Sequence, residues 1–254
     1  MVNLFHGTEA LEDIARILVQ MDANCPHPSS TSRDLWRLRR ATDIASHNRA
    51  PETMLEKAVA MLANKGHLPE WFNQCPTASG IGDSSRNRHS NIDLVHWKEA
   101  HGRARLIELK WASNTPFHAV RQLLRYGAAY VFCRIHRNRL PVSHAPVMNA
   151  REVHLQILAP AQYYTNSNLR GFVLRAREHL KRFKSRSAMT EFSMSLDLLA
   201  FPEWFDDIPF ANGQEVRAEC DCADLTEAGR QICSVFNSLV LQLHIERRCG
   251  PLVP

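Results

Sequence analysis

Two apolar segments separated by only five residues place the strongest constraint on how this chain can fold. The segments NIDLVHWK (91–98) and ARLIELKW (104–111) are both typical of β-strands, and the connection EAHGR between them contains a His-Gly turn signal. A hairpin is the simplest connection for such a pair. The core of the protein is therefore expected to include these two strands as antiparallel neighbours.

Helices and further strands are predicted on either side of this hairpin. The segment APETMLEKAVAMLANKG has a proline and Glu52 near its start and Lys65-Gly66 at its end, which are start and stop signals for a helix. Thr115 and Pro116 are the expected N-cap and first position of another helix, which runs to about Val131. The order helix–strand–strand–strand–helix–strand indicates a mixed α/β core. The hydrophobic periodicity predicts the other elements as helices over 8–21, 33–46, 168–184 and 225–245, and strands over 70–75, 152–159 and 191–200.

The composition is that of a soluble globular protein. The 254 residues are 44% hydrophobic and 22% charged, enough for one large domain or for a core domain with additions. The formal net charge of +5 allows a polyanionic partner but does not establish one. No apolar stretch approaches the roughly 20 residues that cross a bilayer, and the first residues lack the basic region of a secretory signal. Because the seven cysteines are scattered, we expect reduced thiols and a cytoplasmic protein with no membrane partner.

The predicted hairpin brings two carboxylates and one ammonium group together. Side chains alternate across a strand, so Glu108 and Lys110 share one face of the second strand while Leu109 points to the other. Asp93, on the first strand, also belongs to the less apolar face. Carboxylates suit a hard divalent cation such as Mg²⁺ or Mn²⁺, with positions left for water and phosphate. A neighbouring lysine can orient the attacking water and stabilise negative charge that develops on phosphorus.

This pattern resembles the motif of the PD-(D/E)XK nuclease superfamily, which has the restriction-endonuclease-like fold. The resemblance covers roughly residues 51–160. The chain departs from the family pattern at Ile92, where many members have a proline before the motif aspartate. The matching residues are Ile92-Asp93 and then Ile107-Glu108-Leu109-Lys110.

The resemblance implies a metal-dependent phosphodiesterase built on these residues. Asp93 and Glu108 would hold one or two Mg²⁺ (or Mn²⁺) ions, with the Leu109 carbonyl as a further ligand. Lys110 would position and activate the attacking water. All three charged positions of the motif are present in this chain.

Two flanking helices add to the resemblance. Glu56 lies on the helix before the first strand, where many members supply a further acidic residue, so it is expected to complete the metal site. Gln122 and Tyr126 are similar to the Gln-x-x-x-Tyr pattern of the exonuclease-like branch. Gln122 would then assist near the substrate, whereas Tyr126 is more typical of a residue that packs in the core.

Each of these residues also has an ordinary structural explanation. Glu108 and Lys110 could be exposed residues of an edge strand that pair with Asp93 across the hairpin. That explanation does not account for acids gathering on one face of such apolar strands. Glu56 could face solvent, in which case Glu52, one turn earlier on the same helix face, is the substitute.

Two basic segments are candidates for nucleic-acid binding. The predicted helix over 168–184 is strongly basic, and Arg175, Lys181 and Arg182 are expected to contact phosphates. Arg86 and Arg88 precede the first strand of the hairpin and could approach the same backbone. The alternative for both segments is a solvated charged surface.

The expected fold is α/β, with a restriction-endonuclease-like mixed β-sheet core flanked by helices and extra helices at both ends. We expect an N-terminal helical extension over 1–50, a nuclease-like core over 51–200 and a C-terminal helical extension over 201–254 that packs on the core. The expected activity is metal-dependent hydrolysis of phosphodiester bonds in DNA. One alternative is an accessory nucleic-acid-binding protein of the same fold without catalysis, and another is an unrelated α/β protein. Cleavage of both DNA strands would favour a homodimer, an expectation that rests on analogy with the fold.

Overall fold

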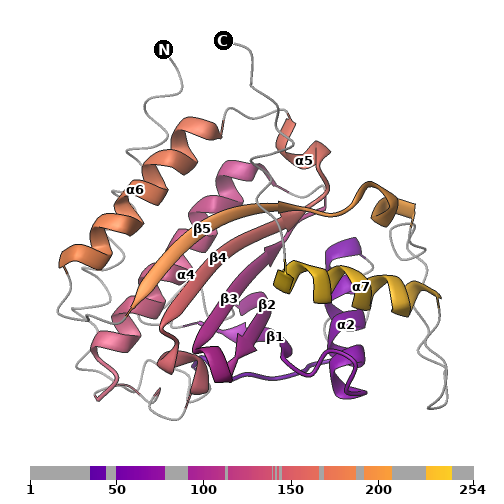
Figure 1. Ribbon diagram of the computed structural model, residues 1–254, viewed down its shortest axis with the longest axis horizontal. Coiled ribbons are helices and arrows are strands. Elements are labelled where there is room, and N and C mark those ends of the chain that lie inside the picture. The colour runs from indigo at the N-terminus through magenta and orange to yellow at the C-terminus, as the bar shows by residue number, and fades with distance from the viewer. Residues whose placement is uncertain are drawn as a thin grey trace.

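The predicted hairpin lies at the centre of the sheet in the computed structural model (Figure 1). Strand β2 (Asn91–Lys98) pairs antiparallel with β3 (Arg103–Leu109), and Leu94 lies opposite Ile107. The connection is a short 3-10 helix that ends at Gly102 with a φ of 59°. Glycine adopts this left-handed conformation without the steric penalty that a Cβ brings, so the turn signal in the sequence has a direct structural cause.

Five strands form one mixed sheet in which the spatial order follows the order in sequence, β1-β2-β3-β4-β5. Strand β1 is antiparallel to β2, whereas β4 is parallel to β3 and β5 is parallel to β4. The sheet therefore has an antiparallel half and a parallel half that meet at β3. The edge strands are β1 (Trp71–Pro76) and β5 (Ser193–Ala200), and β4 (Glu152–Ala159) lies between β3 and β5.

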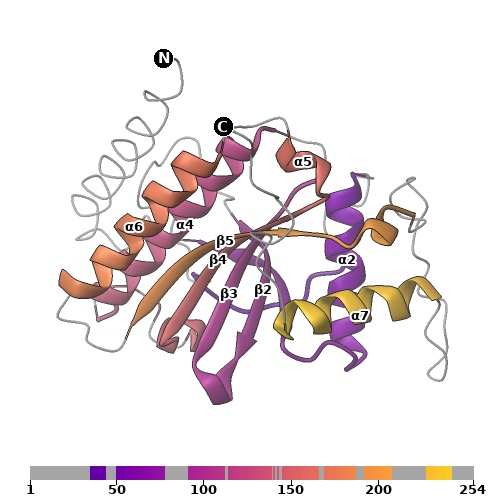
Figure 2. The ribbon, with the colours of Figure 1, turned by 45° about the horizontal axis from the view of Figure 1, so that its top comes forward.

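Helices cover both faces of this sheet, which confirms the mixed α/β core. Apolar side chains of α4 and α6 pack in one hydrophobic core with one face of the sheet, and those of α2 and α7 pack in a second core with the other. In Figure 2, α4 and α6 lie side by side and α7 crosses α2. The helices are α2 (Pro51–Asn64), α4 (Pro116–Ile135), α5 (Gln162–Thr165), α6 (Arg170–Arg186) and α7 (Glu227–Leu241).

The structure describes residues 35–43, 50–77, 91–111, 114–138, 140, 142, 145–165, 169–186, 192–207 and 227–241. Within these ranges, no helix combines the length and the apolar character that a membrane crossing requires. The predicted helix over 8–21 lies outside the described residues. The boundaries predicted for the two extensions stay predictions.

Helix α4 begins where the sequence predicts and lies unusually close to the sheet. The Thr115 side chain accepts a hydrogen bond from the backbone N–H of His118, as an N-cap residue does. At Gly127 a Cβ would lie 2.8 Å from a methyl carbon of Leu155 and 3.0 Å from the sulfur of Met194. A Cβ at this position would displace these side-chain atoms, so glycine lets the helix approach β4 and β5 this closely without repacking Leu155 and Met194.

The prediction of a helix over 33–46 is wrong for the residues that the structure describes. Residues 35–43 run beside β1 as irregular chain, and Arg39 forms an isolated β-bridge with Asn73. The Asn73 side chain accepts a hydrogen bond from the backbone N–H of Ala41 and donates one to its carbonyl. Trp36 has a φ of 58° and is fully buried. Packing against the edge of the sheet thus outweighs the local helical pattern.

Candidate functional site

Asp93 and Glu108 lie side by side at the end of the hairpin farthest from its turn. The register that pairs Leu94 with Ile107 sets Asp93 opposite Glu108 one step further along. The backbone N–H of Leu109 donates a 2.8 Å hydrogen bond to Asp93 Oδ2. Each of the two carboxyl groups acts on the pKa of the other. The structure therefore brings together the two acids that the sequence pattern singled out.

Lys110 completes this group at the junction of β3 and β4. Its backbone N–H donates to the Leu158 carbonyl at 3.0 Å, which continues the pairing of β3 with β4 by one residue. Its Nζ atom donates to Glu108 Oε1 at 2.6 Å. Both side chains are buried, so this ion pair belongs to the interior. An exposed edge-strand pair, the structural alternative, is therefore wrong for Glu108 and Lys110.

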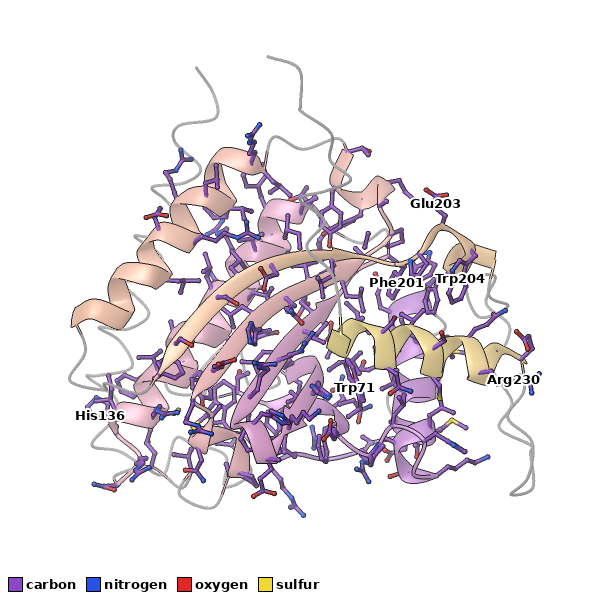
Figure 3. The ribbon with its side chains drawn as sticks, viewed as in Figure 1. Trp71, His136, Phe201, Glu203, Trp204 and Arg230 are labelled. Carbon is purple, nitrogen blue, oxygen red and sulfur yellow. The ribbon has the colours of Figure 1, made fainter. Side chains whose placement is uncertain are left out.

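The residue after Lys110 holds this end of β3 against the second core. The backbone N–H of Trp111 donates to Glu52 Oε1 at 2.8 Å. Its ring lies 5.4 Å from that of Phe201, and the Phe201 ring stacks on Phe205 with their centroids 4.5 Å apart. Figure 3 shows Phe201 and Trp204 beside the end of β5. These aromatic contacts position the chain immediately after Lys110.

Helix α2 contributes two more acids to the same end of the sheet. Glu56 is buried, with 5% of its surface exposed, so the alternative in which it faces solvent is wrong. Gln74 donates from Nε2 to Glu56 Oε1 at 2.6 Å and accepts at Oε1 from Asn91 Nδ2 at 2.8 Å. Gln74 has a φ of 48°, a rare conformation for a residue with a side chain. Glu52, one turn before Glu56, binds the chain after β3 as described above.

Burial raises the pKa values of these acids. Burial, followed by the charge of Asp93, raises the pKa of Glu56 to about 8, against the lowering effect of the hydrogen bonds from Gln74. Burial raises the pKa of Asp93 to about 6, although Lys110 and the hydrogen bond from Leu109 act in the opposite direction. Burial and the Asp93 charge also hold the pKa of Glu108 well above its ordinary value. The cluster therefore retains protons at a pH where exposed carboxyl groups have lost them.

Lys110 provides positive charge in the middle of these acids. Burial alone would lower its pKa, but the charges of Glu108 and Asp93 outweigh burial and raise it. Lys110 is consequently an ammonium ion at neutral pH. The positive charge of Arg39 lowers the pKa of Glu56, against the effect of burial. Among the described residues, the acids of the site (Glu52, Glu56, Asp93 and Glu108) therefore outnumber the two cations that act on them, Lys110 and Arg39.

The donor set fits a hard divalent cation, although the side chains as they stand do not enclose one. Among the described residues, no group of three or more Asp, Glu, His or Cys side chains is arranged to hold a metal ion. Protein donors already occupy one oxygen each of Glu56, Asp93 and Glu108. The other oxygen of Glu108, Oε2, is buried and accepts no hydrogen bond from the described part of the chain. The candidate ligands are carboxylate oxygens and the Leu109 carbonyl that the resemblance implies, and Mg²⁺ and Mn²⁺ prefer such oxygen atoms.

The described contacts of Gln122 connect it to the start of β2 rather than to the carboxyl groups. Its Nε2 donates to the Tyr126 hydroxyl at 2.6 Å, and that hydroxyl donates to the Asn91 carbonyl at 3.0 Å. Tyr126 is buried in the core between α4 and the sheet, as the packing alternative expects. Asn91 lies two residues before Asp93. The pair therefore supports the strand that carries the aspartate.

Tyr163 belongs to this site, and the sequence analysis missed it. It lies on α5, just after β4, and its hydroxyl oxygen is buried without a hydrogen-bond partner in the described part of the chain. Burial, followed by the charges of Glu108 and Glu52, raises its pKa to about 12, so the hydroxyl remains a donor. The signal was its position: the carboxyl ends of parallel strands lie at one edge of a sheet, and β4 is the parallel neighbour of β3.

The residues predicted to bind nucleic acid are only partly described. Arg175 is exposed on α6, as a phosphate contact requires. Arg177 on the same helix has a structural role, because it donates to the Leu196 carbonyl and to Asp197. Arg86 and Arg88 lie outside the described residues, as do the side chains of Lys181 and Arg182. Their role in binding stays a prediction.

Comparisons of this chain with protein-family models, with characterised proteins and with solved structures find no match. The chemistry of the site must therefore be argued from its own residues. Three features carry that argument: the buried excess of carboxyl groups, the lysine paired with Glu108, and the unpartnered oxygen of Glu108.

Proposed function

We propose that this protein is a Mg²⁺-dependent nuclease of the PD-(D/E)XK type that hydrolyses phosphodiester bonds in DNA. The observation that carries the proposal is a set of three acids at one end of the sheet. Glu108 and Glu56 are buried and Asp93 is half-buried, their charges act on one another, and Glu108 is bonded to Lys110. A purely structural cluster would pair each buried charge with an opposite one. This cluster instead holds more acids than cations, at a cost in stability that a bound cation would offset.

The residues of the cluster have separate roles in phosphodiester hydrolysis. Asp93, Glu108 and Glu56 would hold Mg²⁺, which supplies Lewis-acid activation of a phosphoryl oxygen and of water. The Lys110 ammonium group lies beside the attacking water and stabilises negative charge on the phosphate in the transition state. Gln122 supports the site through Tyr126 and the strand that carries Asp93.

A cleavage assay on the unmodified protein tests the proposal directly. Supercoiled and linear DNA are incubated with the protein in Mg²⁺, Mn²⁺ or EDTA, and the products are separated by electrophoresis. We expect cleavage with either metal and none in EDTA. Binding of DNA without cleavage under every metal condition would instead support the accessory protein of the same fold.

Tyr163→Phe tests whether the unpartnered hydroxyl contributes to the reaction. We expect cleavage to slow by roughly 10- to 100-fold, the effect of losing one hydrogen bond to a charged group in the transition state. The melting temperature should not fall, because the hydroxyl makes no hydrogen bond in the described structure. Single-turnover cleavage and thermal unfolding measure the two effects.

Tyr164→Phe is the matched control. The Tyr164 hydroxyl donates to the carbonyls of Ile157 and Leu199, at 3.1 and 2.9 Å. Its removal should lower the melting temperature while cleavage per folded molecule stays unchanged. If both variants cleave at the wild-type rate, Tyr163 has no part in the reaction.

A further inference from the structure

The outer side of helix α4 carries a row of basic residues that begins next to the candidate site. His118, Arg121 and Arg125 are spaced by three and four residues, so they lie on one side of the helix. None of the three is buried, and His118 is exposed. The helix contains no acidic residue from Pro116 to Ile135. We call these three residues the α4 strip.

The strip begins close to Lys110 because α4 starts at Pro116, six residues after Lys110, and His118 lies in the first turn of this helix. Burial, followed by the charges of Lys110, Arg125 and Arg121, lowers the pKa of His118. These three cations therefore lie close enough to His118 to act on its charge. Lys110 in turn donates to Glu108. The beginning of the α4 strip therefore lies near Lys110.

We propose that the α4 strip binds the DNA backbone next to the phosphate that is cleaved. The proposal rests on the proposed nuclease function and adds the side from which the substrate approaches. Seven residues of helix span roughly 10 Å, while each DNA strand carries one phosphate about every 3.4 Å of helix axis. The strip is therefore long enough to meet successive phosphates while the next one reaches Lys110.

Helix α6, the basic segment that the sequence suggested, is less suited to this role. Its Arg177 is bound to β5, and Glu178 reduces its positive charge. Among the described residues, the cations that act on His118 together with Lys110 lie on α4 instead. Arg170 and Arg175 remain exposed on α6 and provide a direct comparison.

The test is the salt dependence of DNA binding, measured in EDTA so that no cleavage is required. Fluorescence anisotropy of a labelled duplex is recorded for the full chain between 50 and 200 mM salt. The double variant Arg121→Gln/Arg125→Gln is expected to lower the slope of log K against log salt by about 1.8, or 0.9 for each lost phosphate contact. The variant Arg121→Lys/Arg125→Lys should have the wild-type slope, because it keeps both positive charges.

Lys65→Gln/Arg137→Gln removes the same charge and is the control. Both residues are exposed and follow the C-terminal ends of α2 and α4, whereas the site lies near the beginning of these helices. The slope of this variant should equal that of the wild type. The proposal is overturned if the α4 variant keeps the wild-type slope, if only Arg170→Gln/Arg175→Gln lowers it, or if the wild type binds no DNA at low salt. Binding through the strip without cleavage in Mg²⁺ would leave this proposal standing and contradict the nuclease function.

Discussion

Glu108→Gln is expected to lower the rate of Mg²⁺-dependent DNA cleavage by roughly 10²- to 10³-fold, the size of effect seen when a key electrostatic contact to a transition state is lost. The substitution keeps the volume of the side chain and removes its negative charge. Asp93→Asn should have a similar effect, and both variants should bind Mn²⁺ more weakly in calorimetry. Lys110→Met should keep metal binding and lose cleavage, because its charge acts on the water and the phosphate.

Asp197→Asn is the matched control for these variants. Asp197 is also a buried acid of the sheet and pairs with Arg177. It lies in register with Gln156 and Ile107, whose side chains are on the face opposite Glu108. The cleavage rate of Asp197→Asn per folded molecule should match that of the wild type. If Asp93→Asn cleaves DNA and binds metal as the wild type does, the carboxyl cluster is not the active site.

Mg²⁺ is expected to raise the melting temperature strongly at pH 8.5 and much less at pH 6. A ligand at 100 times its dissociation constant stabilises the folded state by about 2.7 kcal/mol, or roughly 5 to 10 °C for a chain of this length. At pH 6 protons occupy the carboxyl groups and compete with the metal, because the pKa of Glu56 is about 8 and that of Asp93 about 6. Thermal unfolding at both pH values, with and without Mg²⁺, measures the effect.

The metal-free protein should show the opposite dependence on pH. A carboxyl group with a raised pKa in the folded state binds more protons when folded than when unfolded, so its contribution to stability falls as the pH rises. For Glu56 this loss begins above its ordinary pKa of 4.5 and is complete above about 8. His96, whose pKa burial lowers to about 4, acts in the opposite direction below pH 6.5, so the range from pH 7 to 8.5 isolates the acids.

Glu56→Gln is the control for both effects. It should reduce the fall in stability between pH 7 and 8.5, and it should weaken the stabilisation by Mg²⁺. Metal binding to the wild type at pH 7 should also release protons, which calorimetry in buffers of different ionisation enthalpy detects. Equal stabilisation of wild type and Glu56→Gln by Mg²⁺ would show that Glu56 is not a ligand.

The strands of the hairpin could be predicted from the sequence because their information is local. Alternation of side chains and a glycine turn defined β2 with the bounds that the structure shows, and Thr115 marked the start of α4. The alternation also placed Glu108 and Lys110 on one face, where the structure shows them bonded. These inferences need only the geometry of one strand pair and one helix end.

The parts that could not be predicted depend on contacts between distant segments. Glu56 looks like an ordinary surface residue of a helix until Gln74 and the start of β2 surround it. Tyr163 joins the site only because β4 is parallel to β3. The helical pattern around Trp36 gives way to a bridge with β1, an interaction that no local periodicity encodes.

Because every strand pairs with its neighbours in sequence, the order of assembly of the site is constrained. The Asp93–Glu108 pair lies within one hairpin and can form while later segments are still being synthesised, since chains fold from the N-terminus during translation. At that stage the carboxylates are hydrated and carry their ordinary charge. The carboxylates lose this water only when β4 and α5 dock later. Dissolved divalent cations should therefore accelerate this late docking step and leave the rate of hairpin formation unchanged.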